Sequence, residues 1–127
     1  MTVHAYKAVK RVSMVEGTTP HQLISLLYEA SLSQIAMAQQ HLVSNDHYRL
    51  HQCVDKAIAI VQELQASLLN YQSDELAGNL FELYSYIVRT LIQSQAKYDA
   101  AGFSTCKNLL EILQDAWEAI SPERATA

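Results

Sequence analysis

Residues 50–68, LHQCVDKAIAIVQELQASL, carry the most regular apolar pattern in the chain. Six apolar side chains in this stretch are separated by 4, 3, 4, 3 and 4 positions: Leu50, Val54, Ala57, Val61, Leu64 and Leu68. Residues three and four positions apart share one face of an α-helix, and this alternation is typical of the face by which helices pack in bundles. The stretch therefore predicts a helix that buries one face against other helices.

The preceding segment predicts a second helix that begins at Thr19-Pro20. A threonine can cap the free N–H groups of a helix, and a proline fits the first turn without losing a hydrogen bond. The expected stripe is apolar except for one glutamine and comprises Leu23, Leu27, Ala30, Gln34, Met37 and Leu42, with Ile24, Ile35 and Ala38 beside it. The run Ser44-Asn45-Asp46 predicts the turn that follows.

Two more helices are expected after residue 70. One runs from about Glu75 to Tyr98, capped by Ser73 or Asp74, and has its main apolar face at Leu76, Leu80, Leu83, Ile87 and Leu91. The next follows a break at residues 99–102 and would be capped by Ser104 or Thr105. Its repeat comprises Cys106, Leu109, Leu113, Ala116 and Ile120.

Short connections between long helices favour antiparallel neighbours, so the sequence predicts an all-α fold, an antiparallel up-down-up-down four-helix bundle. The chain has only three Gly and two Pro, too few for the many turns of a β-sandwich or barrel. The expected organisation is an N-terminal arm or short helix at residues 1–18, the bundle at 19–120 and a C-terminal tail at 121–127.

Charge and composition exclude several function classes. The net charge of −4 provides no basic field for nucleic acid or anionic lipid. No apolar run reaches the ~18 residues that a membrane span needs, and no apolar segment follows the basic residues near the N-terminus. Cys53 and Cys106 lie in apolar helical patterns, which favours buried thiols in a reduced, cytoplasmic protein.

The chain lacks the patterns expected of an enzyme or a cofactor protein. His47 and His51 are four positions apart and could face one metal ion, but no H-E-x-x-H or Glu-x-x-His supplies the remaining ligands. His41 lies too near a helix end for a phosphotransfer histidine. No G-x-S-x-G motif, phosphate-binding glycine loop or cysteine with a recognisable base is present. We therefore expect no catalysis, no metal and no cofactor.

The helix expected at residues 75–98 has more apolar surface than one packing stripe needs. The surplus is formed by Leu80, Phe81, Leu83, Tyr84, Tyr86, Ile87, Val88, Leu91 and Ile92. Two interpretations are open: a large aromatic core, or an exposed face for a partner. In the arm, Val3, Tyr6, Val9 and Val12 form an apolar row that could dock on the bundle or become ordered only on binding.

Several segments, taken together, resemble the FliS-type flagellar export chaperones. Similar to the family, in order along the chain, are residues 5–7 (AYK), 19–29 (TPHQLISLLYE), 56–64 (KAIAIVQEL), 76–86 (LAGNLFELYSY) and 109–117 (LLEILQDAW). The stretch 76–86 is the most specific of them. The chain departs from the family at Ala30-Ser31, where a glycine is frequent, and at residues 72–74, where a glycine-rich turn is frequent.

The resemblance implies a cytoplasmic bacterial protein of type III flagellar export that binds the C-terminal segment of flagellin. That segment is disordered in the free subunit, and holding it in apolar helix–helix grooves prevents premature polymerisation before secretion. Components of the export apparatus are a second expected class of partner, and no nucleic acid or membrane is expected. The expected chaperone is a monomer or a weak homodimer.

We expect the partner-binding residues on the surplus apolar face and in the arm: Leu80, Tyr84, Ile87, Leu91, Tyr6 and Val9. On this interpretation Tyr84→Ala weakens flagellin binding and leaves the helicity largely intact. The alternative is a non-enzymatic helical bundle that serves as a dimerisation or regulatory adaptor module. Binding of a disordered flagellin tail distinguishes the two.

Overall fold

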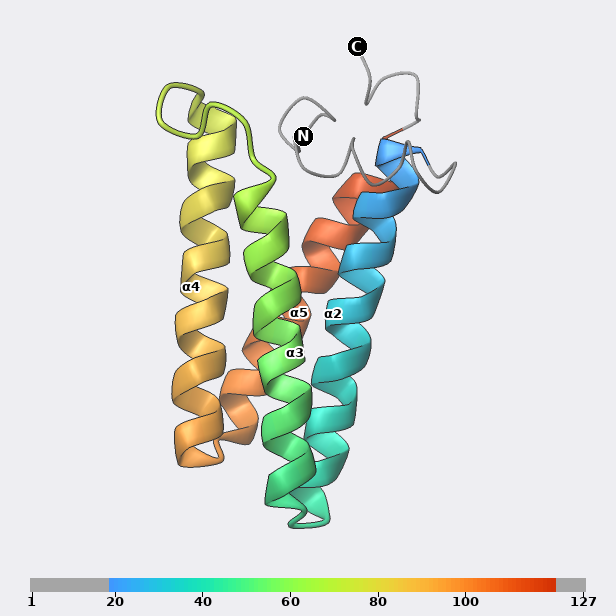
Figure 1. Cartoon of the computed structure of the whole chain (residues 1–127), viewed down its shortest axis with the longest axis vertical. Coiled ribbons are helices and arrows are strands. Elements are labelled where there is room, and N and C mark those ends of the chain that lie inside the picture. Colours follow the sequence, from blue (N-terminus) through green and yellow to red (C-terminus); the bar gives the residue numbers. More distant parts are fainter. Residues whose placement is uncertain (1–18, 121–127) are drawn as a thin grey trace.

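The computed structural model describes residues 19–120, which form four α-helices and, within that range, no β-strand. The helices are α2 (Pro20–Val43), α3 (His47–Ala66), α4 (Glu75–Lys97) and α5 (Ala100–Glu118). Successive helices run in opposite directions, with α3 between α2 and α4, and α5 crosses behind α3 (Figure 1). Each helix packs against its neighbour in sequence, and α2 packs against α5. The predicted all-α four-helix bundle is confirmed. The predicted arm and tail lie outside the described residues.

Four polar side chains begin the helices. Thr19 accepts a hydrogen bond from the Gln22 backbone N–H at 3.1 Å, and the Gln22 side chain accepts one from the Thr19 N–H in return. Asp46, Asp74 and Asp99 cap α3, α4 and α5, each by accepting one backbone N–H hydrogen bond from the first turn of its helix, without the reciprocal bond. The prediction that Ser104 or Thr105 caps α5 is wrong, because α5 already begins at Ala100.

The core confirms the pattern from which the bundle was predicted. All six apolar residues of the 50–68 pattern are buried, five of them completely. The stripe predicted for α2 is displaced: Ile24, Tyr28, Ile35 and Ala38 are fully buried, whereas Ala30 and Met37 are exposed. Similarly, α5 buries Phe103, Cys106, Leu110 and Trp117 while Ala116 is exposed. Both helices carry two adjoining apolar rows, and the position of their neighbours decided which row went inside.

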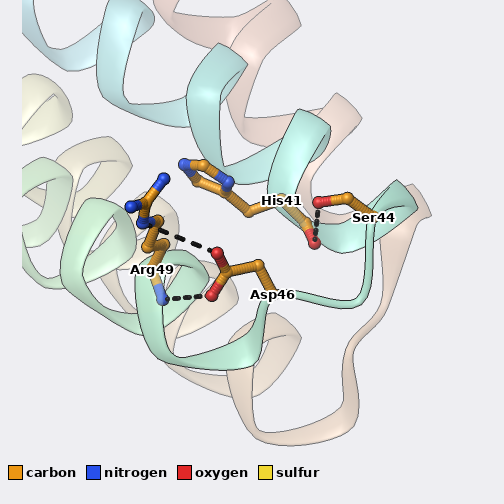
Figure 2. A network of polar contacts seen from close by, with 4 residues as sticks. All are labelled: His41, Ser44, Asp46 and Arg49. Atoms are coloured by element: carbon orange, nitrogen blue, oxygen red, sulfur yellow. Dashed lines mark hydrogen bonds and ion pairs between the residues drawn. The ribbon is translucent and has the colours of Figure 1, made fainter.

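The α2–α3 turn is short and internally bonded (Figure 2). The Ser44 hydroxyl donates to the His41 carbonyl at 3.3 Å, and the Arg49 backbone N–H donates to Asp46 at 3.1 Å. The Arg49 side chain also lies 3.6 Å from the Asp46 carboxylate, but both groups face solvent, so this ion pair adds little to stability. Hydrogen bonds between side chains and the backbone, rather than the ion pair, fix this turn.

Two contacts set the course of α5. Near its start, the Cys106 thiol lies 3.6 Å from the Ile87 carbonyl of α4. Near its end, the Trp117 indole donates to the His21 carbonyl at 2.9 Å, and the His21 ring stacks on it with centroids 4.7 Å apart. The N-terminal end of α5 is therefore attached to α4 and its C-terminal end to the start of α2.

Burial raises the pKa of the Cys106 thiol to about 12, so this thiol stays protonated at neutral pH.

Candidate partner-binding surface

The four bundle residues predicted to bind a partner lie inside the bundle. Tyr84, Ile87 and Leu91 are completely buried and Leu80 is 7% exposed. A partner cannot touch fully buried side chains while the helices stay packed as described. Tyr6 and Val9 lie outside the described residues. The contact prediction for these six residues stays a prediction.

Beside the four buried residues of α4 lies an edge of this helix that faces α5. The contacts of Ile87 with Cys106 and of Ser94 with Gly102 identify this edge. Leu83 and Leu76 lie on the same edge, because they are four and eleven residues before Ile87. Leu83 is half-buried and Leu80 is 7% exposed, whereas Leu76, in the first turn of α4, is 49% exposed.

The matching edge of α5 is also apolar. Leu109 and Leu113 follow Cys106 by three and seven residues, so they continue the edge that faces α4, and both are half-buried. Ile112 borders them on the outer side and is 64% exposed. No charged residue lies on this edge between Cys106 and Leu113, because Lys107 and Glu111 fall on the other side of the helix.

The two edges separate where α4 begins and α5 ends. Figure 1 shows α5 beside the C-terminal end of α4, from which it crosses behind α3 toward the N-terminal end of α2. The Trp117–His21 contact fixes that far end. We define the α4–α5 apolar surface as Leu76, Leu80 and Leu83 of α4 with Leu109, Ile112 and Leu113 of α5. Leu76 and Ile112 stay exposed because no other described helix covers them.

The described residues around this surface carry a negative charge. All five Lys and Arg residues of the described range lie in the halves of α3, α4 and α5 nearest the α2–α3 turn: Arg49, Lys56, Arg89, Lys97 and Lys107. Among residues 19–120, the charged residues of the opposite end, where α4 and α5 separate, are all acids: Glu29, Glu63, Asp74, Glu75, Glu82, Glu111, Asp115 and Glu118. Such a field repels nucleic acids and phosphates from the apolar surface. The surface therefore fits a polypeptide with apolar side chains.

The family of the chain follows from comparison with known sequences. The sequence pattern described as flagellar protein FliS matches residues 2–124, nearly the whole chain. The chain belongs to the FliS family. Among the relatives named flagellar secretion chaperone FliS are proteins from three bacteria. The one from Salmonella typhimurium is 34% identical over 95% of this chain and 90% of its own length. The one from Bacillus subtilis is 32% identical over 87% of this chain and 82% of its own length. The one from Escherichia coli is 31% identical over 90% of this chain and 85% of its own length.

Two of the FliS-like segments form the two sides of the α4–α5 apolar surface. Residues 76–86 supply its α4 side, and residues 109–117 supply its α5 side. The departures from the family pattern lie elsewhere: Ala30 is on the exposed side of α2, and residues 72–74 form the loop before α4. Neither departure replaces a residue of this surface.

The two histidines considered as metal ligands have another role in this FliS chain. The His47 ring stacks on Tyr98 with centroids 4.1 Å apart, and His51 Nε2 lies 3.0 Å from the Tyr98 hydroxyl. Within residues 19–120 no three His, Cys, Asp or Glu side chains gather in a way that could hold a metal ion. Sequence reasoning missed Tyr98, since no local pattern signals a contact across some fifty residues.

Two open hollows also occur in the described part. One of about 440 Å³ lies at the loop before α4, and the stacked Tyr71 and Phe81 are among the residues that line it. The other, of about 540 Å³, lies beside His21, Ser25 and Glu118. His21 Nε2 bonds the Trp117 carbonyl, and the Ser25 hydroxyl donates to the His21 carbonyl, so the two side chains do not form a nucleophile–base pair.

None of the four helices described in residues 19–120 is long and apolar enough to cross a bilayer.

Proposed function

We propose that this chain is a bacterial flagellar export chaperone that binds the C-terminal segment of flagellin on the α4–α5 apolar surface. The observation that carries the proposal is that the apolar edges of α4 and α5 stay partly exposed where the two helices separate. The name of the relatives, flagellar secretion chaperone, supports the same role. The chain would act in the cytoplasm, before the client is exported.

The physical mechanism is coupled folding and binding. A disordered amphipathic segment becomes helical when its apolar side chains lie against an apolar surface on its partner. Ordering the segment costs about 2–5 kcal/mol of the interaction energy, which keeps the complex releasable. Covering the polymerising face of flagellin in this way would prevent filament assembly before secretion. No bond is made or broken, so the proposed role is binding rather than catalysis.

The six predicted contact residues have different roles in this proposal. Leu80 and Ile87 lie on the edge of α4 that borders the surface, and Leu80 contributes to its base. Tyr84 and Leu91 are fully buried and would support the surface from within. Tyr6 and Val9 stay proposed contacts from the arm. Export components stay a proposed second class of partner.

The test is calorimetric titration with a peptide that covers the last forty or so residues of flagellin from the same genome. We expect saturable one-to-one binding with a negative heat-capacity change, since apolar area is buried. Removing two exposed apolar contacts, in Leu76→Gln with Ile112→Gln, should raise the Kd at least about tenfold. The matched control is Leu26→Gln with Ile92→Gln, which alters side chains of similar exposure outside the surface and should leave the Kd within about twofold.

Two results would overturn the proposal in different ways. Equal weakening by both pairs would place the client elsewhere on the bundle. No binding by a protein whose helicity is intact would refute the chaperone role and favour the adaptor module.

A further inference from the structure

Three residues other than glycine have positive φ angles in residues 19–120, and each lies at a helix connection. They are Asn45 (φ 58°), Asn70 (φ 56°) and Tyr98 (φ 52°). Asparagine tolerates the left-handed conformation better than most residues, whereas a bulky residue adopts it rarely. Tyr98 is therefore the exception, and a residue held in an unfavourable conformation points to a function of its side chain.

The Tyr98 side chain is held by two histidines from the first turns of α3. The His47 ring stacks on it at 4.1 Å with the planes inclined by 21°. His51 Nδ1 lies 2.8 Å from Gln95 Oε1, an acceptor, so Nδ1 donates and Nε2 accepts from the Tyr98 hydroxyl at 3.0 Å. The Gln95 amide nitrogen in turn donates to Asp55 at 3.3 Å, which fixes the orientation of the amide.

These contacts act on the connection from which α5 departs. Only Tyr98 and Asp99 lie between the end of α4 and the start of α5. The backbone of α5 is close to α4 there, since a Cβ atom at Gly102 would collide with the Ser94 side chain. The conformation of Tyr98 therefore acts on the direction in which α5 leaves α4, while the Trp117–His21 contact holds the far end of α5 against α2.

We propose that Tyr98, held by His47 and His51, is a positioning residue that sets the opening between α4 and α5. This inference rests on the proposed function in one respect, namely that the opening between α4 and α5 presents the α4–α5 apolar surface to the flagellin segment. A simple helix cap would need only the left-handed backbone, which an asparagine supplies equally well. The positioning role needs the aromatic ring and its hydroxyl.

The decisive variant is Tyr98→Asn, because it keeps the left-handed backbone and removes the ring. The first readout is the distance between spin labels at Glu82→Cys on α4 and Asp115→Cys on α5, both exposed positions. The labelled parent carries Cys53→Ala. Cys106 stays in place, since its thiol is buried and protonated at the labelling pH. The second readout is the Kd of the unlabelled variant for the flagellin peptide.

We expect Tyr98→Asn to broaden and shift the distance distribution and to raise the Kd about tenfold. The control is Asn45→Gly, which alters another left-handed corner and should change neither readout. If Tyr98→Asn fails to fold, His47→Ala replaces it, since it leaves the Tyr98 backbone and hydroxyl bond in place and should broaden the distribution in the same way.

Either an unchanged distance distribution or an unchanged Kd in a folded variant overturns the inference. If the parent protein does not bind the peptide, the proposed function fails by itself. The distance measurement then still decides whether Tyr98 sets the opening.

Discussion

At the scale of the residue, Tyr84 is the clearest example of a side chain whose role depends on its surroundings. Its ring is completely buried, and its hydroxyl lies 2.7 Å from that of Tyr28, which comes from α2. A hydrogen bond between two buried hydroxyls ties α4 to α2 across the bundle. The side chain thus contributes to the interior rather than to an outer surface.

We predict that Tyr84→Ala destabilises the bundle by about 3–5 kcal/mol, because it removes a buried ring and leaves a cavity. Chemical denaturation followed by circular dichroism measures the change. Tyr86→Ala is the matched control: Tyr86 lies two residues on, is 43% exposed and should change stability by less than about 1 kcal/mol. A Tyr84→Ala protein as stable as the parent would contradict the burial of this ring.

At the scale of the element, the relation between α4 and α5 depends on close backbone contact at one end. Gly102 lies inside α5, where glycine is ordinarily unfavourable, yet its missing side chain allows α5 to approach Ser94 of α4. From this contact the two helices separate toward the other end (Figure 1). A tight end and an open end therefore belong to the same pair of helices.

Gly102→Ala should lower the stability by about 1–3 kcal/mol, although alanine favours a helix more than glycine does. The added Cβ would come within 2.9 Å of Ser94 Cβ, which cannot rotate away. Thermal unfolding measures the loss. The double variant Gly102→Ala with Ser94→Gly should recover part of it, because the colliding side chain is gone. A single variant with unchanged stability would show that α5 has room to shift.

At the scale of the whole molecule, the bundle has two unlike ends. The end with the α2–α3 turn carries all five described basic residues and the held Tyr98 side chain. The opposite end is acidic and has the exposed leucine and isoleucine of the α4–α5 apolar surface. Backbone hydrogen bonds are less protected where fewer helices cover an element, so the two ends should also differ in local stability.

Hydrogen exchange should show this difference along α4. We predict that amides of residues 79–83 exchange faster than those of residues 87–94, because α5 covers only the later part. Mass spectrometry of peptic fragments measures both rates in one sample. Adding the flagellin peptide should slow exchange in the earlier part specifically. Uniform protection along α4 without the peptide would contradict the separation of α4 and α5.

Much of the architecture was predictable from local patterns. The 4-3 spacing of Leu50 to Leu68, the cap at Thr19, the turn at residues 44–46 and a cap at Ser73 or Asp74 were all predicted, and the structure confirms them with Asp74 as the cap of α4. The FliS-like segments also gave the family. These features depend on residues close together in the sequence, where periodicity and capping act directly.

Which face of a helix goes inside depended on tertiary packing. In α2 and α5 two adjoining apolar rows were both compatible with a bundle, and only the neighbouring helices selected between them. The same reason explains why Tyr84 and Leu91, for which the sequence left both a core and a partner-binding position open, lie in the core, while Leu76 and Ile112 are exposed. By itself the sequence determined four helices, their order and their family. Only the tertiary structure decided where α4 and α5 separate, because that depends on contacts such as His47–Tyr98 and His21–Trp117 between residues distant in the chain.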